Sequence, residues 1–242
     1  MTNHWNTYTT WGSVEPPFKP TETIVEQYAE ILGNPDNLLL LGCTKELIPL
    51  GKYTVAYDNC QTRMDMFPGN SLGVNWLNME PSEPTYDAIT GDASLNCISF
   101  NHWEEVIRRC KLITAGPIVF RVYENYTTPK TLEDIKSGVK NKTIPSFSCL
   151  KLELFFYLAN SIPDVITSEI TTLFYSLFKS KENLQELTGW DINTINAIDT
   201  YINSDVIYCF PREPYIKRKF PEAKRVSSQY YPMAEYCPFY IF

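Results

Sequence analysis

The chain has 242 residues, a net charge of −7 and a pI near 5.0. This acidic balance disfavours a broad electrostatic surface for nucleic acid, whereas a hydrophobic content of 44% is enough for one large core. The start of the sequence does not resemble a signal peptide, and no segment has the roughly 20 apolar residues of a membrane span. We therefore expect a soluble, cytoplasmic protein that binds neither membranes nor nucleic acid.

Residues that commonly bind metals are few and scattered. The seven cysteines include no C-x-x-C pair, and the only histidines are His4 and His102. Zinc sites usually draw on such residues at short spacings, so we expect no metal site and reduced cysteines.

Residues 1–20 form an aromatic arm that contains Trp5, Trp11 and Phe18 and ends in the proline-rich segment PPFKP. Proline fixes the backbone of such a segment in an extended conformation. The arm could cover one face of the core or close over a ligand, and the sequence leaves both roles open.

The first regular elements are a helix and two strands. Apolar residues at helical spacing follow Thr21 and end at Gly33, and the stretch LLLLGCTKEL, residues 38 to 47, predicts a buried strand that turns at Gly42. A second strand, residues 53 to 57, stops at Asp58. A carboxylate at this place can accept both hydroxyl protons of a ribose, although Asp58 could equally cap the next helix.

A short third strand is predicted over residues 72 to 76, and it ends in Asn75 and Trp76. The amide of Asn75 suits the edge of an adenine and the indole of Trp76 suits its face, while Met64 could rest against the purine. The alternative is an ordinary strand end with a tryptophan in the core.

Two further strands complete the predicted central sheet. Residues 86 to 98 contain a fourth strand that breaks at Gly91 and Asp92, a helix follows over 103 to 112, and a fifth strand over 117 to 123 ends near Arg121 and Tyr123. Ligands of open α/β sheets bind at the carboxyl ends of the strands. Asp92 is therefore a candidate base or electrostatic partner, and Arg121 could contact a ligand or pair with a carboxylate of the fold.

In order and spacing, these motifs resemble those of class I S-adenosylmethionine-dependent methyltransferases, in particular a little-described bacterial subgroup with a Trp-rich N-terminal arm. The resemblance implies an α/β fold with a Rossmann-like, mostly parallel sheet, an antiparallel last strand and S-adenosylmethionine as the cofactor. The cofactor-binding residues that it implies are Gly42, Cys43, Thr44, Asp58, Met64, Asn75, Trp76, Asp92, Ser94 and Leu95. The residues that it suggests for catalysis are Asp92, Tyr123 and Arg121.

The pattern of the remaining residues predicts a helical insertion and short C-terminal strands at one edge of the sheet. Residues 125–204 are expected to form helices that cap the strand ends, and their apolar face could also support a homodimer. Residues 21–124 and 205–242 would form the Rossmann-like domain, with the last strands near 224 to 231 and 236 to 242.

We expect methyl transfer to a small molecule or metabolite. A methyltransferase-like binding module without turnover is the alternative, because the loop after the first strand has a single glycine and because Asn75 stands where the family more usually has an acid. A nicotinamide-dependent oxidoreductase is disfavoured, since pyrophosphate binding needs glycine-flanked amides at a helix start and this loop does not supply them.

Overall fold

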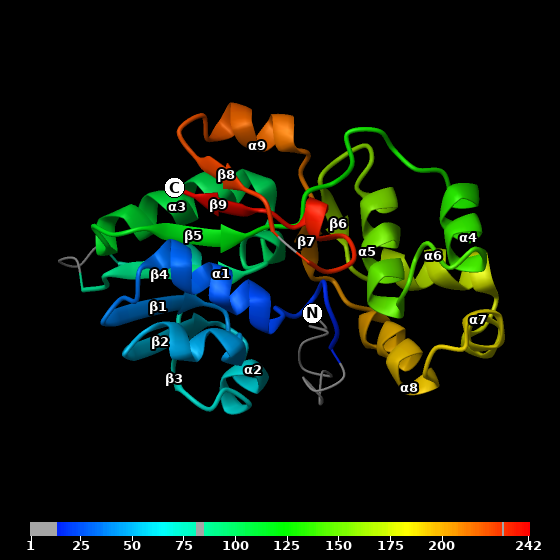
Figure 1. Ribbon diagram of the computed structural model, residues 1–242, viewed down its shortest axis with the longest axis horizontal. Helices are drawn as coiled ribbons and strands as arrows, with labels where there is room; N and C mark the ends of the chain where they lie inside the picture. Colours follow the sequence, from blue (N-terminus) through cyan, green and yellow to red (C-terminus); the bar gives the residue numbers. More distant parts are fainter. Residues whose placement is uncertain (1–13, 81–84, 229) are drawn as a thin grey trace.

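The computed structural model describes residues 14–80, 85–228 and 230–242, so most of the aromatic arm, including Trp5 and Trp11, lies outside the described residues. A seven-stranded sheet has the order β3-β2-β1-β4-β5-β9-β8 (Figure 1). Its first five strands are parallel, and β9 runs antiparallel to both β5 and β8. The strands are β1 (Asn37–Leu41), β2 (Tyr53–Asp58), β3 (Asn70–Gly73), β4 (Ala88–Asp92), β5 (Ile118–Arg121), β8 (Lys224–Val226) and β9 (Phe239–Ile241).

The central strand β1 is apolar on both of its faces because a helix covers each face of the sheet. Leu38 and Leu40 pack in one cluster with Tyr28 of α1 (Glu22–Leu32). Leu39 and Leu41 pack in another cluster with Trp103 of α3 (Trp103–Ile113). A strand that is buried on both sides reads as a continuous apolar run rather than an alternating one.

Helix α1 has both of the end signals that its sequence predicts. The side chain of Thr21 accepts a hydrogen bond from the amide of Ile24 at 3.2 Å, and Gly33 ends the helix in the left-handed conformation. These two interactions satisfy backbone groups that a helix end otherwise leaves unpaired.

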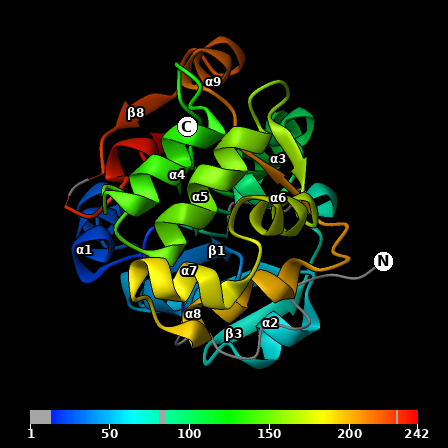
Figure 2. The same ribbon diagram turned by 90° about the vertical axis from the view of Figure 1, so that its right-hand side faces the viewer.

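A second body of helices lies beside the sheet, on the right in Figure 1. Figure 2 views the molecule from this side, with α4, α5 and α6 in front. Phe147, Phe155 and Phe174 belong to its large buried cluster. The elements are α4 (Leu132–Lys140), α5 (Phe147–Leu158), α6 (Glu169–Phe178), α7 (Lys181–Thr188), α8 (Ile192–Ile195) and a two-stranded sheet of β6 (Asp164–Ile166) and β7 (Ile207–Cys209).

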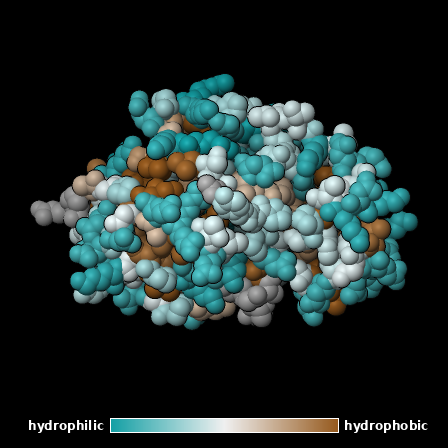
Figure 3. All heavy atoms as spheres, in the orientation of Figure 1, coloured by the Kyte–Doolittle hydropathy of each residue, from teal (hydrophilic) through white to brown (hydrophobic). Residues whose placement is uncertain are grey.

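The other helices are shorter. The α-helix α2 (Gln61–Asp65) joins β2 to β3, and α9 (Glu213–Lys219) joins β7 of the two-stranded sheet to β8 of the large sheet. Three-residue and six-residue 3-10 helices occupy Lys45–Leu50, Trp76–Asn78, Leu95–Cys97, Phe100–His102, Asn196–Tyr201 and Ala234–Tyr236. No helix of the described residues combines the length and the apolar character that crossing a membrane requires. Hydrophilic residues cover most of the face in Figure 3, and hydrophobic ones form small separate groups.

One local expectation differs from the structure. The third strand is Asn70–Gly73 rather than residues 72 to 76, because its ladder pairs with Val55–Asp58 and Trp76 then begins a 3-10 helix. The turn at Gly42 leads into a 3-10 helix, Lys45–Leu50, with Pro49 inside it. Proline lacks the backbone N–H that a longer α-helix would need at this point.

Candidate functional site

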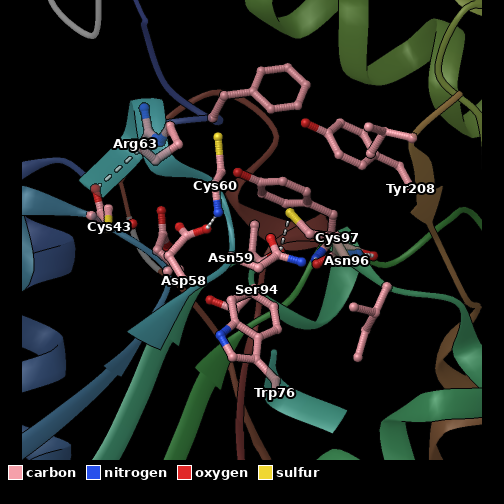
Figure 4. A pocket seen from close by; sticks show the side chains of 18 of the residues that line it. Cys43, Asp58, Asn59, Cys60, Arg63, Trp76, Ser94, Asn96, Cys97 and Tyr208 are labelled. Atoms are coloured by element: carbon pink, nitrogen blue, oxygen red, sulfur yellow. Dashed lines mark hydrogen bonds between the residues drawn. The ribbon is translucent and has the colours of Figure 1, made fainter. Parts of the chain in front are cut away.

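A cavity of about 280 Å³ lies between the carboxyl ends of the parallel strands and the helical insertion. Figure 4 shows Asp58 and Cys43 on one side of the pocket and Tyr208 on the other. The predicted site residues on its wall are Gly42, Cys43, Thr44, Asp58, Asn75, Trp76, Asp92, Ser94 and Tyr123. Residues that were separate strand ends in the sequence therefore surround one space.

The turn after β1 needs a glycine. Gly42 has φ of +92°, a backbone conformation that side-chain-bearing residues rarely adopt. A Cβ atom added there would lie 3.6 Å from the hydroxyl of Ser94 and 3.8 Å from the ring of Trp76. The hydroxyl of Ser94 donates a hydrogen bond to the carbonyl of Leu41, which holds the loops after β1 and β4 together.

Asp58 ends β2 as a buried carboxylate on the cavity wall. Its oxygen Oδ1 accepts a hydrogen bond from the amide of Cys60 at 2.9 Å. Burial raises the pKa of Asp58, and the nearby guanidinium of Arg63 opposes that shift. Burial and the Asp58 carboxylate raise the pKa of the Cys43 thiol to about 12, so this thiol stays protonated at neutral pH.

The loop after β3 presents Asn75 and Trp76 to the same cavity. The indole Nε1 of Trp76 donates to the carbonyl of Tyr57 at 2.7 Å, which fixes the ring beside the end of β2. The side-chain oxygen of Asn75 accepts from the amide of Leu77 at 3.0 Å and caps the 3-10 helix. The amide nitrogen of Asn75 keeps its two hydrogens as donors toward a ligand.

Asp92 and Arg121 form a buried ion pair between neighbouring strands. They are register partners in β4 and β5, and Nη2 of Arg121 lies 2.8 Å from Oδ2 of Asp92. Arg121 also donates to the hydroxyl of Tyr231 at 2.6 Å and to the carbonyl of Pro17 at 2.8 Å. The side chain of Arg121 has no exposed surface and that of Asp92 has 2%.

This ion pair changes the roles considered for both residues. Each carboxylate oxygen of Asp92 accepts a hydrogen bond from Arg121, so a proton taken up by Asp92 would disrupt a buried pair. Arg121 contacts the fold rather than the cavity. In this structure the pair joins β4 to β5, and Arg121 also bonds to Pro17. The pairing favours a structural role for both residues, and their direct part in catalysis stays a prediction.

Tyr123 lines the cavity but its hydroxyl is engaged as well. It donates a hydrogen bond to the carbonyl of Pro17 at 2.9 Å, and burial raises its pKa well above the usual value. A phenol that holds its proton so firmly can shape the cavity or donate a hydrogen bond but is a poor base.

Met64 and Leu95 lie away from the cavity wall. Met64, in α2, packs against the cluster on the α1 side of the sheet, and Leu95 is fully buried in the cluster that contains Trp103. The segment after β4 directs Leu95 into the core, where its burial is favourable, whereas Met64 is only partly buried.

The comparisons with known proteins show the fold. No family model matches the chain, and the search of curated proteins found no match. A structure described as a putative Zn-dependent alcohol dehydrogenase from Rhodobacter sphaeroides aligns with 100% of this chain and 98% of its own, with a TM-score of 0.60 and 12% identity. The DhpI–SAH complex aligns with 91% of this chain and 82% of its own, with a TM-score of 0.50 and 10% identity.

The N-methyltransferase NodS from Bradyrhizobium japonicum WM9 covers 91% of this chain and 95% of its own, with a TM-score of 0.45 and 12% identity. The direction of β9 distinguishes a class I methyltransferase sheet from a dinucleotide-binding sheet. Here β9 lies antiparallel beside β5, whereas the strand at that position of a dinucleotide-binding sheet is parallel. The chain has the class I methyltransferase fold. Its expected mostly parallel sheet with an antiparallel last strand is thereby confirmed.

Within this methyltransferase fold, several cavity residues had not been singled out from the sequence. Asn59 and Asn96 line the cavity from the segments that follow β2 and β4, Arg63 lines it from α2, and Lys151 lines it from α5. The sequence could have indicated Lys151, because this residue is a charge within the apolar helical stretch CLKLELFFYL. The sequence indicated Arg63 more weakly, as a cation five residues after the candidate ribose acid, Asp58.

Asn96 connects the strand-end loops to the insertion. Its amide nitrogen donates to the carbonyls of Tyr123 at 3.0 Å and Cys209 at 2.6 Å, and its oxygen accepts from the amide of Tyr123 at 2.9 Å. A buried amide with these bonds fixes the position of β7 relative to β5. The cavity therefore has a rigid wall on the insertion side.

Metal-binding side chains are not gathered at the cavity. Among residues 14–80, 85–228 and 230–242, no three histidine, cysteine, aspartate or glutamate side chains are placed to hold one metal ion.

Proposed function

We propose that the protein is an S-adenosylmethionine-dependent methyltransferase that acts on a small molecule or metabolite. The observation that carries this proposal is the convergence of Gly42, Asp58, Trp76 and Ser94, from four strand ends, on one cavity. The structure of DhpI was solved as an SAH complex, which supports an adenosyl ligand for this fold.

The residues present fit such a cofactor. Gly42 leaves space beside Ser94 and Trp76 that a side chain at this position would fill. Asp58 has a carboxylate whose second oxygen can accept hydroxyl protons of a ribose, while Oδ1 is held by the amide of Cys60. Asn75 and Trp76 offer an amide donor and an aromatic face for the adenine.

The single glycine in the first loop is consistent with this proposal. Lys45 and Glu46, where glycines are absent, do not have positive φ values, whereas Gly42 does. The loop therefore has a glycine at the position whose backbone requires it. The small number of glycines is therefore compatible with cofactor binding.

The chemistry needs little beyond alignment. S-adenosylmethionine supplies a methyl group on a positively charged sulfur, and the acceptor must place its nucleophilic atom in line with that methyl. The buried Asp92–Arg121 pair fixes the ends of β4 and β5 beneath the cavity, and Tyr123 and Phe210 exclude water from its inner wall. A base is required only if the acceptor must lose a proton.

Calorimetric titration with S-adenosylhomocysteine tests the proposal. The wild type should bind it, and Asp58→Asn should weaken binding about 10-fold to 100-fold, since a hydrogen bond to a charged group contributes about 1.5–3 kcal/mol. Asp36→Asn is a matched control, because Asp36 is exposed and precedes the amino end of β1. Absence of binding to the wild type at millimolar ligand would refute the proposal.

A second measurement separates turnover from binding. Incubation with methyl-labelled S-adenosylmethionine and a metabolite panel should transfer the label to one class of acceptor. Binding without transfer to any acceptor would support the module instead.

A further inference from the structure

Lys151 is a buried cation on the insertion side of the cavity. It lies in α5, is 3% exposed and lines the cavity together with Phe18 and Tyr208. Its ammonium nitrogen lies 4.8 Å from the ring centroid of Phe18 and 5.6 Å from that of Phe147. An aromatic face stabilises a cation less than a carboxylate or water does.

No carboxylate forms an ion pair with Lys151 within the part of the chain that the structure describes. Lys151 makes no ion pair or hydrogen bond there, and the neighbouring Glu153 pairs with Lys130 at 2.6 Å. Glu15 influences the Lys151 ammonium electrostatically but is exposed and forms no ion pair with it. Asp92, which also lines the cavity, is already paired with Arg121.

The surroundings of Lys151 are aromatic. The ring of Phe18 contacts that of Tyr123 edge-on at 5.5 Å, and Tyr123 is stacked at 6.5 Å with Phe210. Tyr208 meets Phe210 edge-on at 6.2 Å. Figure 4 shows Tyr208 across the pocket from Asp58, and Phe18, Tyr123 and Phe210 line the same cavity, so aromatic side chains contribute much of its wall.

An ammonium group at such a position remains largely charged near neutral pH. Burial lowers the pKa of Lys151 to about 8, so the protonated form still exceeds the neutral form by about tenfold at pH 7. Burying a cation without a counterion is unfavourable, and an anion from a ligand would remove that cost.

Resting on the proposed function, we propose that the methyl acceptor is an aromatic carboxylate whose acid group pairs with Lys151 and whose ring packs against Phe18, Tyr123 and Phe210. One compact ammonium suits a single carboxylate, whereas phosphate sites usually combine several donors, an arginine fork or a helix N-terminus. Aromatic walls contribute favourable stacking to a planar ligand.

The test compares a carboxylate with its uncharged amide. Protein saturated with S-adenosylhomocysteine is titrated calorimetrically with benzoate, 4-hydroxybenzoate and indole-3-carboxylate and with the three matching carboxamides. In the wild type, at least one carboxylate should bind at least 10-fold more tightly than its amide. Lys151→Met should abolish that preference, and Lys151→Arg should retain part of it.

Two controls separate this role from a structural one. Lys140→Met removes an exposed lysine of α4 and should keep the preference. Lys151→Met should bind S-adenosylhomocysteine within about threefold of the wild type, since Lys151 lies in α5 of the helical body whereas Asp58 ends β2 of the large sheet. A loss of S-adenosylhomocysteine binding in this variant, with the carboxylate preference kept, would assign Lys151 to the cofactor and overturn the proposal.

The remaining outcomes are also decisive. If no carboxylate binds more tightly than its amide, or if Lys151→Met keeps the preference, the proposed acceptor class is wrong. If the wild type does not bind S-adenosylhomocysteine, the proposed function fails. The same titrations of carboxylates and carboxamides, carried out without S-adenosylhomocysteine, then still determine whether Lys151 selects carboxylates.

Discussion

Replacing Asp92 by asparagine would break the buried ion pair with Arg121 while keeping the size of the side chain. Arg121 is fully buried and would keep three neutral acceptors, namely the hydroxyl of Tyr231, the carbonyl of Pro17 and the amide oxygen of the new asparagine. Breaking a buried pair costs about 3–5 kcal/mol, and these neutral acceptors favour the lower end. We expect Asp92→Asn to lower the free energy of unfolding by about 3 kcal/mol, or the melting temperature by about 6–12 °C.

Urea unfolding at pH 7 measures this loss, provided that the slope of the transition matches that of the wild type. Arg121→Met should be similarly unstable, because Asp92 then lacks its cation. The double variant should lose less than the sum of the two single losses, since no unpaired charge remains. Glu213→Gln, which disrupts a partly exposed pair with Lys217, should have a far smaller effect.

The opposite pattern would refute the structural role. If Asp92→Asn unfolds within about 0.5 kcal/mol of the wild type and yet loses methyl transfer, Asp92 acts in the reaction, as first expected from the sequence. A double variant with fully additive losses would likewise show that the two charges do not stabilise each other.

Three further predictions follow from other positions. Gly42→Ala should lose about 1–2 kcal/mol of stability from its left-handed backbone and bind S-adenosylhomocysteine more weakly, because the methyl would fill the space near Ser94 and Trp76. Gly33→Ala, also at positive φ but with no atom within 4 Å of the added Cβ, should lose stability and keep binding. Burial lowers the pKa of Lys151 to about 8, below the ~10.4 of an unfolded lysine, so the unfolded chain binds more protons between these values. The free energy of unfolding of the wild type relative to Lys151→Met should therefore rise by up to about 3 kcal/mol between about pH 8 and about pH 10.4 in urea titrations, and a flat difference would contradict the lowered pKa. Asn96→Ala should cost about 2–3 kcal/mol in the same assay, because it leaves the buried carbonyls of Tyr123 and Cys209 without their donor; a loss below about 0.5 kcal/mol would exclude this role.

The sequence predicts the central strands well because their burial leaves a direct pattern. The run Leu38–Leu41 is apolar on both faces, as a strand between two helix layers must be. The edge strand β3 lacks this pattern: its Leu72 is 52% exposed, while the apolar Val74 and Trp76 that suggested a strand lie beyond its end. An edge strand is paired on one side only, so its hydrogen bonds rather than its composition define it.

The candidate site was predictable as a set of strand ends but not in its individual roles. Asp58 and Trp76 meet at the cavity because parallel strands end at the same edge of the sheet. Asp92 and Arg121 stand at that edge too, and only the register of β4 with β5 shows that they face each other. Lys151 is more than a hundred residues from Gly42, so its place in the cavity depends on how the insertion folds back.

The bonds between the sheet and the insertion bear on how the molecule would unfold. Besides Asn96, which bonds to Cys209 next to the insertion, Asp164 of β6 accepts hydrogen bonds from the hydroxyl of Ser99 and from the amide of Phe100 at 3.0 Å. Separating the two bodies would expose these buried groups and the aromatic wall around Tyr123 together. Their unfolding free energies are therefore coupled, and calorimetry should record one cooperative transition rather than two.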